Sequence, residues 1–305
     1  MKKLLLFSVA VVMLFSAFDA AAQRGDDDAR AAAAAWLRNM SRVEHCTLRS
    51  DVLGTERNYT VYLPAGYDAD PSRSYPVLYL LHGMNDVDRS WYDRGHVKDV
   101  MDQLTASGEV CPMIIVTPDA GGSVAEGKWN GYFDMEGWPY EKFFFEEFVP
   151  AVETKFRIKA DKEHRAVAGL SMGGGGCTSY AQRHPGMFCA CYAMSALMHL
   201  PEADAAKMKA GDKTALLTDA VHRLSCVEYV RAADDEVKNA LRSVAWFVDC
   251  GDDDFLFDCN IDFVRAMRAA WIPCQLRVRD GGHTWEYWHS ALYTALPFFS
   301  RQFGR

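Results

Sequence analysis

The sequence has no excess of basic residues. Its 33 lysines and arginines are outnumbered by 41 aspartates and glutamates, which gives a formal net charge of −8 at pH 7. Nucleic acids and anionic membrane surfaces repel a negative chain, so we expect neither as a partner. The sequence also has no membrane-spanning run. Its longest apolar stretch, residues 4–18, is shorter than the roughly 18 residues that a bilayer crossing needs.

Cysteines with the spacing of a metal site are absent as well. The nine cysteines include one close pair, Cys189 and Cys191, whose side chains would share one face of a strand. We expect these two mainly in the core. The spacing assigns no disulfide, although an oxidising compartment would permit one. We expect no metal and no cofactor.

The chain does begin with the pattern of a secretory signal peptide. Lys2 and Lys3 precede the apolar stretch, and residues 20–22 are alanines suited to cleavage. We therefore expect residues 1–22 to be a signal peptide cut near Ala22, and the protein to be exported to the periplasm or secreted by a bacterium. We expect residues 23–44 to form an N-terminal tail.

Residues 45–305 alternate between apolar runs and helix-like segments, as in one α/β domain. Continuous apolar runs such as VLYLL and MIIV are typical of strands buried on both faces of a parallel sheet. The expected strands are His45–Val52, Tyr59–Leu63, Pro76–Leu81, Met113–Thr117, Arg165–Leu170, Phe188–Met194, Ala245–Cys250 and Cys274–Arg279. The expected helices are Val97–Ser107, Tyr140–Phe156, Gly174–His184, Asn260–Ala270 and Trp288–Phe303. This predicts a mostly parallel sheet of about eight strands with helices on both faces.

Two segments depart from the alternation. The first two strands are joined by the short segment GTERN, which would also suit an antiparallel hairpin. Residues 197–243 are charged and helix-forming. We expect them to form a helical insertion over the edge of the sheet, where it could act as a partial lid.

The segment Gly169-Leu170-Ser171-Met172-Gly173 places a serine where an expected strand turns into an expected helix. In that context a G-x-S-x-G motif forms a nucleophile elbow, with a strained serine backbone and neighbouring chain too close for larger flanking residues. Residues 174–176 are three more glycines, each costing up to about 1 kcal/mol in a helix relative to alanine. A tightly packed helix start would justify that cost, and a flexible loop is the alternative.

A serine nucleophile needs a histidine base and a carboxylate that orients the histidine. In α/β-hydrolases the acid and then the histidine follow the serine on later strand ends. The strand VAWFVDC is followed by Asp252, Asp253 and Asp254, and the strand CQLRVR by a glycine-rich loop with His283. We expect Ser171, His283 and one of these aspartates to form a triad. A solvated acidic turn or a calcium site is the alternative for the aspartates, although no EF-hand spacing follows.

An acyl-transfer intermediate also needs hydrogen-bond donors for its oxyanion. We expect the backbone N–H of Met172, directly after the serine, to be one donor. The segment LLHGMND, residues 80–86, follows an early strand and offers the second at Met84. We expect His82 in this segment to orient the loop rather than to act as a base.

The segments HGMND, GLSMGG, GDDD and GGH together make residues 45–303 resemble the esterase family of the α/β-hydrolases. That family includes feruloyl and acetylxylan esterases, S-formylglutathione hydrolases of the esterase D type and mycolyltransferases. The resemblance implies an α/β-hydrolase fold, with Ser171 as nucleophile and His283 as base. It also favours Asp254, the last residue of G-x-x-D, as the acid, and the amides of Met84 and Met172 as the oxyanion hole.

The resemblance further implies a secreted serine carboxylic-ester hydrolase that forms an acyl-enzyme. Its expected substrate is a feruloyl or acetyl ester on a plant cell-wall polysaccharide or oligosaccharide. Aromatic and amide side chains near the motif loops are candidate substrate contacts, namely Trp285, Trp138, Trp129 and Asn85. The alternatives are a mycolyltransferase-like acyltransferase and a carbohydrate-binding module that keeps the fold without the chemistry.

Overall fold

The computed structural model describes residues 30–31, 39–123, 126–200 and 212–304. The chain divides into two compact units, one of residues 42–64 and 73–305 and one of residues 1–41 and 65–72. The predicted signal peptide lies outside the described residues, as do most of the predicted tail and residues 201–211 of the predicted insertion. Among the described residues, none of the helices combines the length and the apolar character that a bilayer crossing requires.

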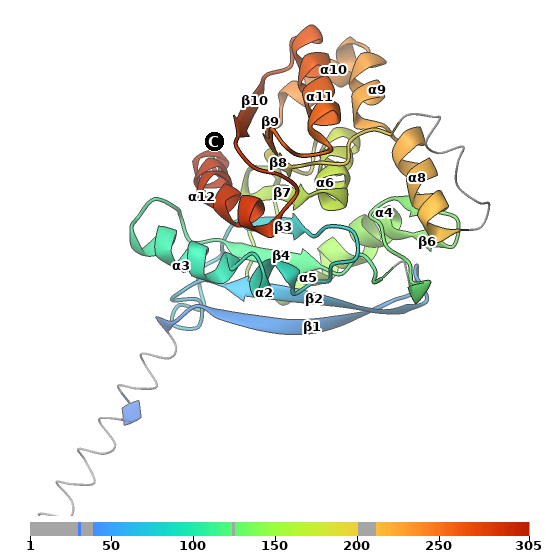
Figure 1. Ribbon diagram of the computed structural model, residues 1–305. Helices are drawn as coiled ribbons and strands as arrows, with labels where there is room; N and C mark the ends of the chain where they lie inside the picture. The colour runs from blue at the N-terminus through green and yellow to red at the C-terminus, as the bar shows by residue number, and fades with distance from the viewer. Residues whose placement is uncertain (1–29, 32–38, 124–125, 201–211, 305) are drawn as a thin grey trace, which may run out of the picture. The chain divides into compact units, whose positions relative to one another are not determined.

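The eight expected strands form one sheet in the larger unit (Figure 1). They are β1 (Arg42–Ser50), β2 (Thr55–Leu63), β3 (Val77–Leu81), β4 (Ile114–Pro118), β7 (Arg165–Leu170), β8 (Ala190–Met194), β9 (Ala245–Gly251) and β10 (Cys274–Arg279). Their order is β1-β2-β4-β3-β7-β8-β9-β10. β2 pairs antiparallel with both β1 and β4, and the remaining neighbours are parallel. The predicted α/β fold and the opening hairpin are therefore confirmed.

The strands at the centre of the sheet are buried along their whole length. Every residue of β3, β4, β7 and β8 is buried, as their continuous apolar runs require. The edge strand β10 is more exposed, and Leu276 and Val278 face solvent on it. A separate two-stranded ribbon pairs β5 (Asp134–Met135) with β6 (Trp138–Pro139).

Helices cover both faces of the sheet. They are α2 (Ser90–Asp93), α3 (Val97–Ala106), α4 (Tyr140–Phe143), the π-helical η2 (Phe144–Phe148), α5 (Val149–Lys155), the 3₁₀ turn η3 (Lys162–His164), α6 (Met172–Arg183), α8 (Lys213–Arg223), α9 (Cys226–Arg231), α10 (Asp235–Arg242), α11 (Phe257–Ala269) and α12 (Trp285–Gln302). α3 and α12 pack together over the face that carries Leu78 and Leu80 (Figure 1). Tyr79, on the opposite face, contacts the rings of Phe144 and Phe148. Helices α8, α9 and α10 come after β8 and before β9 along the chain, where the fold prediction placed a helical insertion.

Several helix starts differ from the predicted ones. α6 begins at Met172, before the glycines, because the strand turns directly into the helix at Ser171. α12 begins at Trp285, since the side chain of Thr284 caps it by accepting from the N–H of Tyr287. All nine cysteines are free. Cys191 is buried, and the half-buried Cys189 packs against the core.

Candidate active site

The backbone at Ser171 has the strain expected of a nucleophile elbow. Ser171 joins β7 to α6 with φ 53° and ψ −119°, in the positive-φ range that residues other than glycine seldom adopt. A Cβ atom on Gly169 would lie 2.2 Å from the carbonyl oxygen of Gly173, and one on Gly173 would lie 2.5 Å from that of His82. Neither glycine therefore tolerates a side chain. The flexible-loop alternative is wrong, because the chain continues as helix α6.

The glycines that follow let α6 start against the loop after β8. A Cβ atom on Gly175 would lie 2.0 Å from the carbonyl oxygen of Leu197. The backbone N–H of Leu197 in turn donates to the carbonyl oxygen of Ser171 at 2.9 Å. The low helix propensity of glycine is thus offset by close packing that fixes the serine between two loops.

The structure brings the three predicted triad residues together at the carboxyl ends of β7, β9 and β10. Nε2 of His283 lies 2.9 Å from Oγ of Ser171. Nδ1 of His283 lies 3.0 Å and 2.9 Å from the two carboxylate oxygens of Asp254. Because the carboxylate only accepts, Nδ1 carries the proton and Nε2 is free to accept the serine hydroxyl. This is the arrangement that a serine nucleophile requires.

The structure also separates Asp254 from the two aspartates before it. Asp254 is 4% exposed and accepts the N–H of Leu256 at 2.9 Å besides that of His283. Burial by itself would raise its pKa, but hydrogen bonds from His283, Leu256 and Ser195 outweigh burial. The pKa of Asp254 consequently lies below its ordinary value, and the carboxylate stays ionised beside the base.

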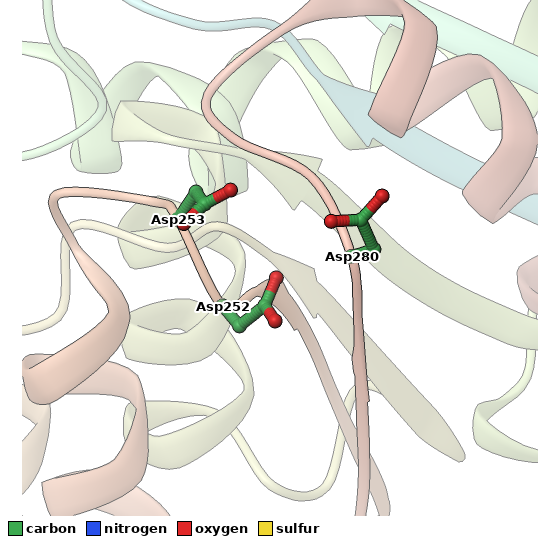
Figure 2. Close-up of side chains that lie close together, drawn as sticks. All are labelled: Asp252, Asp253 and Asp280. Carbon is green, nitrogen blue, oxygen red and sulfur yellow. The ribbon is translucent and has the colours of Figure 1, made fainter.

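Asp252 and Asp253, unlike Asp254, are exposed to solvent. With Asp280 on the neighbouring strand end they form a cluster whose carboxylate oxygens lie within 4.8 Å of one another (Figure 2). Asp252 also accepts the N–H of Gly281 at 3.2 Å, which ties the acid loop to the histidine loop. Exposed acidic clusters are common without an ion, so we assign no metal here.

Two aromatic rings hold the imidazole of His283. Phe255 lies over it at 4.5 Å between ring centroids and is itself 76% exposed. Trp288 meets it edge-on from the protein side at 4.8 Å, with the ring planes at 90°. The base is therefore fixed by packing as well as by its carboxylate.

The residues that carry the two predicted oxyanion donors lie at the same cavity as the serine. Met84 and Met172 line the same cavity as Ser171. Met172 is the first residue of α6, and the N–H groups of a first helical turn have no partner within the helix. The role of Met84 and Met172 as oxyanion donors stays a prediction.

His82 orients the loop that carries Met84, as predicted. It is fully buried, its Nδ1 lies 2.8 Å from the carbonyl oxygen of Gly83, and its Nε2 accepts the N–H of Ala120 at 3.0 Å. Burial lowers the pKa of His82, which keeps the ring neutral and able to make both bonds.

Two cavities meet at Ser171. The first has a volume of about 570 Å³ and is mainly apolar, with lining residues Met84, Met172, Leu197, His199, Leu200, Thr214, Leu217, Thr218, Val221, Phe255, Leu256, Asp258, Cys259 and Asp262. The second has the same volume but more polar walls, formed by Gly83, Met84, Asn85, Asp86, Arg94, Leu170, Phe255, His283, Thr284, Trp285, Glu286 and Trp288. We call them the apolar pocket and the polar pocket.

Comparison with known proteins places this site in a family. Residues 50–299 match the family model described as "Putative esterase". The chain belongs to this esterase family. The resemblance inferred from the four motif segments is thereby confirmed, and membership makes the chain a serine carboxylic-ester hydrolase by class.

Individual relatives of this esterase-family chain carry related names. A ferulic acid esterase of known structure is 60% identical, with a TM-score of 0.83, and the match covers 87% of this chain and 99% of that one. An endo-1,4-β-xylanase/feruloyl esterase of Xylanibacter ruminicola is 34% identical over 167 residues, which are 54% of this chain and 23% of that protein. A fluorophosphonate-binding serine hydrolase of Staphylococcus aureus shares the fold at 19% identity and a TM-score of 0.69, over 86% of this chain and 99% of that one. The chain spans less than a third of the length of the curated relatives it matches.

The predicted substrate contacts of this esterase-family member divide into two pairs. Asn85 and Trp285 line the polar pocket, although Trp285 is 8% exposed and shows only part of its ring. Trp129 and Trp138 stack on each other, with centroids 6.0 Å apart, in a separate groove of about 550 Å³. The structure does not bring this second pair to Ser171, so its role in substrate binding stays a prediction.

Sequence reasoning assigned no place beside the triad to three residues that surround it. Phe255 follows the acid directly, yet nothing in the sequence indicates that its ring reaches His283. Ser195 and Trp288 lie behind the acid and the base, on the end of β8 and in α12. Ser195 is a lone serine after an apolar strand and belongs to no motif. The available signal was its position at the end of a strand next to β7.

Proposed function

We propose that this protein is a serine esterase that releases feruloyl groups from plant cell-wall polysaccharides through an acyl-enzyme. The observation that carries the proposal is the hydrogen-bonded series Ser171–His283–Asp254 at the junction of an apolar and a polar pocket. The ferulic acid esterase at 60% identity supports the acyl group. The xylanase/feruloyl esterase relative supports a xylan-type polysaccharide.

The geometry of the triad supports the following reaction. Nε2 of His283 takes the hydroxyl proton of Ser171 as Oγ attacks the ester carbonyl, and the amides of Met84 and Met172 hold the oxyanion. The ester bond breaks when His283 gives that proton to the sugar oxygen. A water molecule then loses a proton to His283 and attacks the acyl-enzyme. As the acyl–oxygen bond breaks, His283 gives that proton to Oγ of Ser171, which releases the acid and restores the serine. Asp254 stabilises the imidazolium in both halves.

The apolar pocket fits an aromatic acyl group. Its volume of about 570 Å³ far exceeds what an acetyl group fills and falls in the range of pockets for aromatic ligands. Leu197, Leu217 and Val221 offer apolar side chains to a planar ring. The helical segment before β9 supplies two of these residues and thereby sets the size of the acyl group.

The far part of the apolar pocket carries a histidine suited to an oxygen-bearing ring. Nδ1 of His199 lies 2.9 Å from Oγ of Ser225, and this oxygen also accepts the N–H of Glu228. His199 also lines the apolar pocket, and its imidazole supplies a polar group there for a phenolic or methoxy oxygen.

The polar pocket suits the sugar that carries the ester. It presents the carboxylates of Asp86 and Glu286 and the guanidinium of Arg94, which pairs with Asp86 at 2.9 Å. Such groups form hydrogen bonds with sugar hydroxyls. An aromatic acyl group would displace water from them without replacing the lost hydrogen bonds.

We also propose that residues 1–22 direct export. The motivating pattern is Lys2 and Lys3 before an apolar stretch that ends in small residues. A cell-wall polysaccharide lies outside the cell, so export would bring enzyme and substrate together. Sequencing the N-terminus of the protein recovered from the medium or periplasm tests the cut near Ala22, and an intact Met1 there would contradict it.

To test the enzymatic proposal, turnover of methyl ferulate, acetylated xylan and a short aryl ester is measured for the native protein and for Ser171→Ala. We expect the native protein to prefer methyl ferulate and Ser171→Ala to turn over none of the three. Turnover unchanged by Ser171→Ala would refute the mechanism, and a preference for acetylated xylan would refute the feruloyl assignment. Adding a sugar acceptor and analysing the products separates hydrolysis from acyl transfer.

A further inference from the structure

Two exposed apolar side chains lie where the apolar pocket and the polar pocket meet. Phe255 is 76% exposed and Met84 is 43% exposed. Among the residues that the structure describes, these two and Ser171 line both pockets. Met84 follows β3 and Phe255 lies in the loop after β9, and these strands stand on opposite sides of β7 in the sheet. The two side chains therefore come to the nucleophile from opposite sides.

The exposure of Phe255 differs from that of an isolated apolar residue on a protein surface. Single exposed apolar side chains are common and need no explanation. The ring of Phe255, however, is part of the wall of the apolar pocket, so its exposed surface extends an apolar surface that is already concave. Apolar surface of this kind is typical of a ligand contact. The ring thus lies where a bound group would cover it.

The triad acid fixes the backbone on both sides of Phe255. The carboxylate of Asp254 accepts the N–H of Leu256 at 2.9 Å, and its backbone carbonyl oxygen accepts the N–H of Phe257 at 2.9 Å. The N–H of Asp254 donates to the carbonyl oxygen of Gly251 at 3.3 Å. Because Phe255 lies inside this hydrogen-bonded turn, its backbone needs no ordering when a substrate binds, and a contact made in advance costs little conformational entropy.

The ring of Phe255 also lies beside the reacting groups. Its centroid is 4.5 Å from that of the His283 imidazole, with the ring planes at 46°. Nε2 of the same imidazole lies 2.9 Å from Oγ of Ser171. An ester whose carbonyl carbon is attacked by this oxygen must therefore lie close to the ring of Phe255, whichever pocket holds its larger half.

We propose that Phe255 is a substrate-contacting residue that packs against the ester where its acyl and alcohol halves join. This rests on the proposed function, because it gives the ring a part in binding the same ester. Contact with the substrate removes the apolar surface of the ring from water and covers the exposed side of His283, whose side chain is 19% exposed. A feruloyl ester of a sugar covers the ring from both pockets, whereas a short ester covers only part of it. Phe255 thereby favours substrates with two large halves.

The first test measures binding in the absence of turnover. Ser171→Ala and the double variant Ser171→Ala/Phe255→Ala are titrated with methyl ferulate in a calorimeter. We expect the double variant to bind about tenfold more weakly, because the apolar contact with the ring is lost. Equal binding by the two variants would overturn the role of Phe255 alone. Absence of binding by Ser171→Ala would refute the proposed function and this inference with it.

The second test compares substrates with the nucleophile intact. We expect Phe255→Ala to raise KM about tenfold for methyl ferulate and about thirtyfold for a feruloylated oligosaccharide, with kcat changed by less than about threefold. Phe255→Tyr keeps the ring and should restore both KM values to within about twofold. Phe255→Leu keeps apolar volume without the ring and should restore them only in part.

The matched control is Trp271→Ala. Trp271 is an aromatic residue that is 84% exposed and lies outside the lining of both pockets, so its removal should leave both KM values unchanged. The midpoint of thermal unfolding should stay close to that of the native protein in Phe255→Ala, because an exposed ring buries little apolar surface in the fold. An unchanged KM in Phe255→Ala would overturn the proposal. A lower kcat and a lower midpoint with KM unchanged would also overturn it, since the ring would then only support the base.

Discussion

The two pockets that meet at Ser171 have equal volume and opposite chemistry. The apolar pocket is walled largely by the helical segment between β8 and β9 and by the start of α11, whereas the polar pocket is walled by the loop after β3 and by residues 283–288. An ester of an aromatic acid with a sugar has the same division between an apolar and a polar half. The comparison indicates that such an ester can bind at Ser171 with each half in a pocket of matching polarity. Neither half then gives up hydration without compensating contacts.

Removing the group that both pockets share should have the largest effect. Ser171→Ala takes away the nucleophile while leaving both walls intact, and we expect kcat on methyl ferulate to fall by about ten-thousandfold or more. Stopped assays with product quantification measure the loss. Binding of ferulate by calorimetry should be retained, and a variant that lost both activity and binding would mean that the elbow had collapsed.

Filling the apolar pocket should affect one half of the substrate alone. Leu197 lines this pocket, and Leu197→Trp would occupy space that a feruloyl ring needs. We expect kcat/KM for methyl ferulate to fall about thirtyfold, since about 2 kcal/mol of ring burial is lost. Turnover of a short-chain acetyl ester should change little.

The matched control for this change is Leu276→Trp on the exposed face of β10. It adds the same ring far from either pocket and should leave both substrates unaffected. Equal losses on feruloyl and acetyl esters in Leu197→Trp would contradict the assignment of the apolar pocket to the acyl group.

Changing the polar pocket should have a smaller effect that depends on the sugar. The side chain of Arg94 is 57% exposed, pairs with Asp86 and lies over the ring of Trp285 at 4.9 Å. Exposed groups of this kind contribute modestly, so we expect Arg94→Ala to lower kcat/KM for a feruloylated oligosaccharide by about threefold. Methyl ferulate, which lacks the sugar, should be unaffected. Arg89→Ala, an exposed arginine outside the pocket lining, serves as the control.

The stability of the protein should depend on pH through His82, which holds a loop that lines both pockets. His82 holds the loop that carries Met84, and burial lowers its pKa below the ordinary value of 6.5. Below about pH 6.5 His82 binds a proton in the unfolded chain but stays neutral in the folded chain. The free energy of unfolding therefore decreases as the pH is lowered. We expect His82→Gln to be less stable near neutrality but to lose less stability on acidification, as measured by urea unfolding. An identical pH slope in the variant would argue against a buried neutral His82.

The sequence predicted the strand ends and the three residues of the triad far better than it predicted the pocket walls. Buried parallel strands are continuous apolar runs, so β3, β4, β7 and β8 could be located without an alignment. Ser171 directly follows β7, and Asp254 and His283 lie in the loops after β9 and β10. The choice of Asp254 over its neighbours depended on family resemblance. Side-chain direction within a turn is set by packing that sequence spacing does not encode.

The walls of the pockets depend on contacts between distant segments. Charge and helix propensity indicated helices in residues 197–243 but not which of their faces meets Ser171. Trp129 and Trp138 are near the motif loops in sequence, yet they stack on each other in a different groove. Ser195 gave no signal because its hydroxyl is contacted by Trp288, which lies 93 residues further along the chain.

The order of the chain also has a consequence for synthesis. Ser171 precedes its imidazole partner by 112 residues, and the helix that follows His283 packs back onto α3. A ribosome must therefore deliver His283 and the helix after it before the hydroxyl finds its proton acceptor. Until then the nascent chain carries an unassisted alcohol, and the ability to cleave esters arises only once that helix has packed.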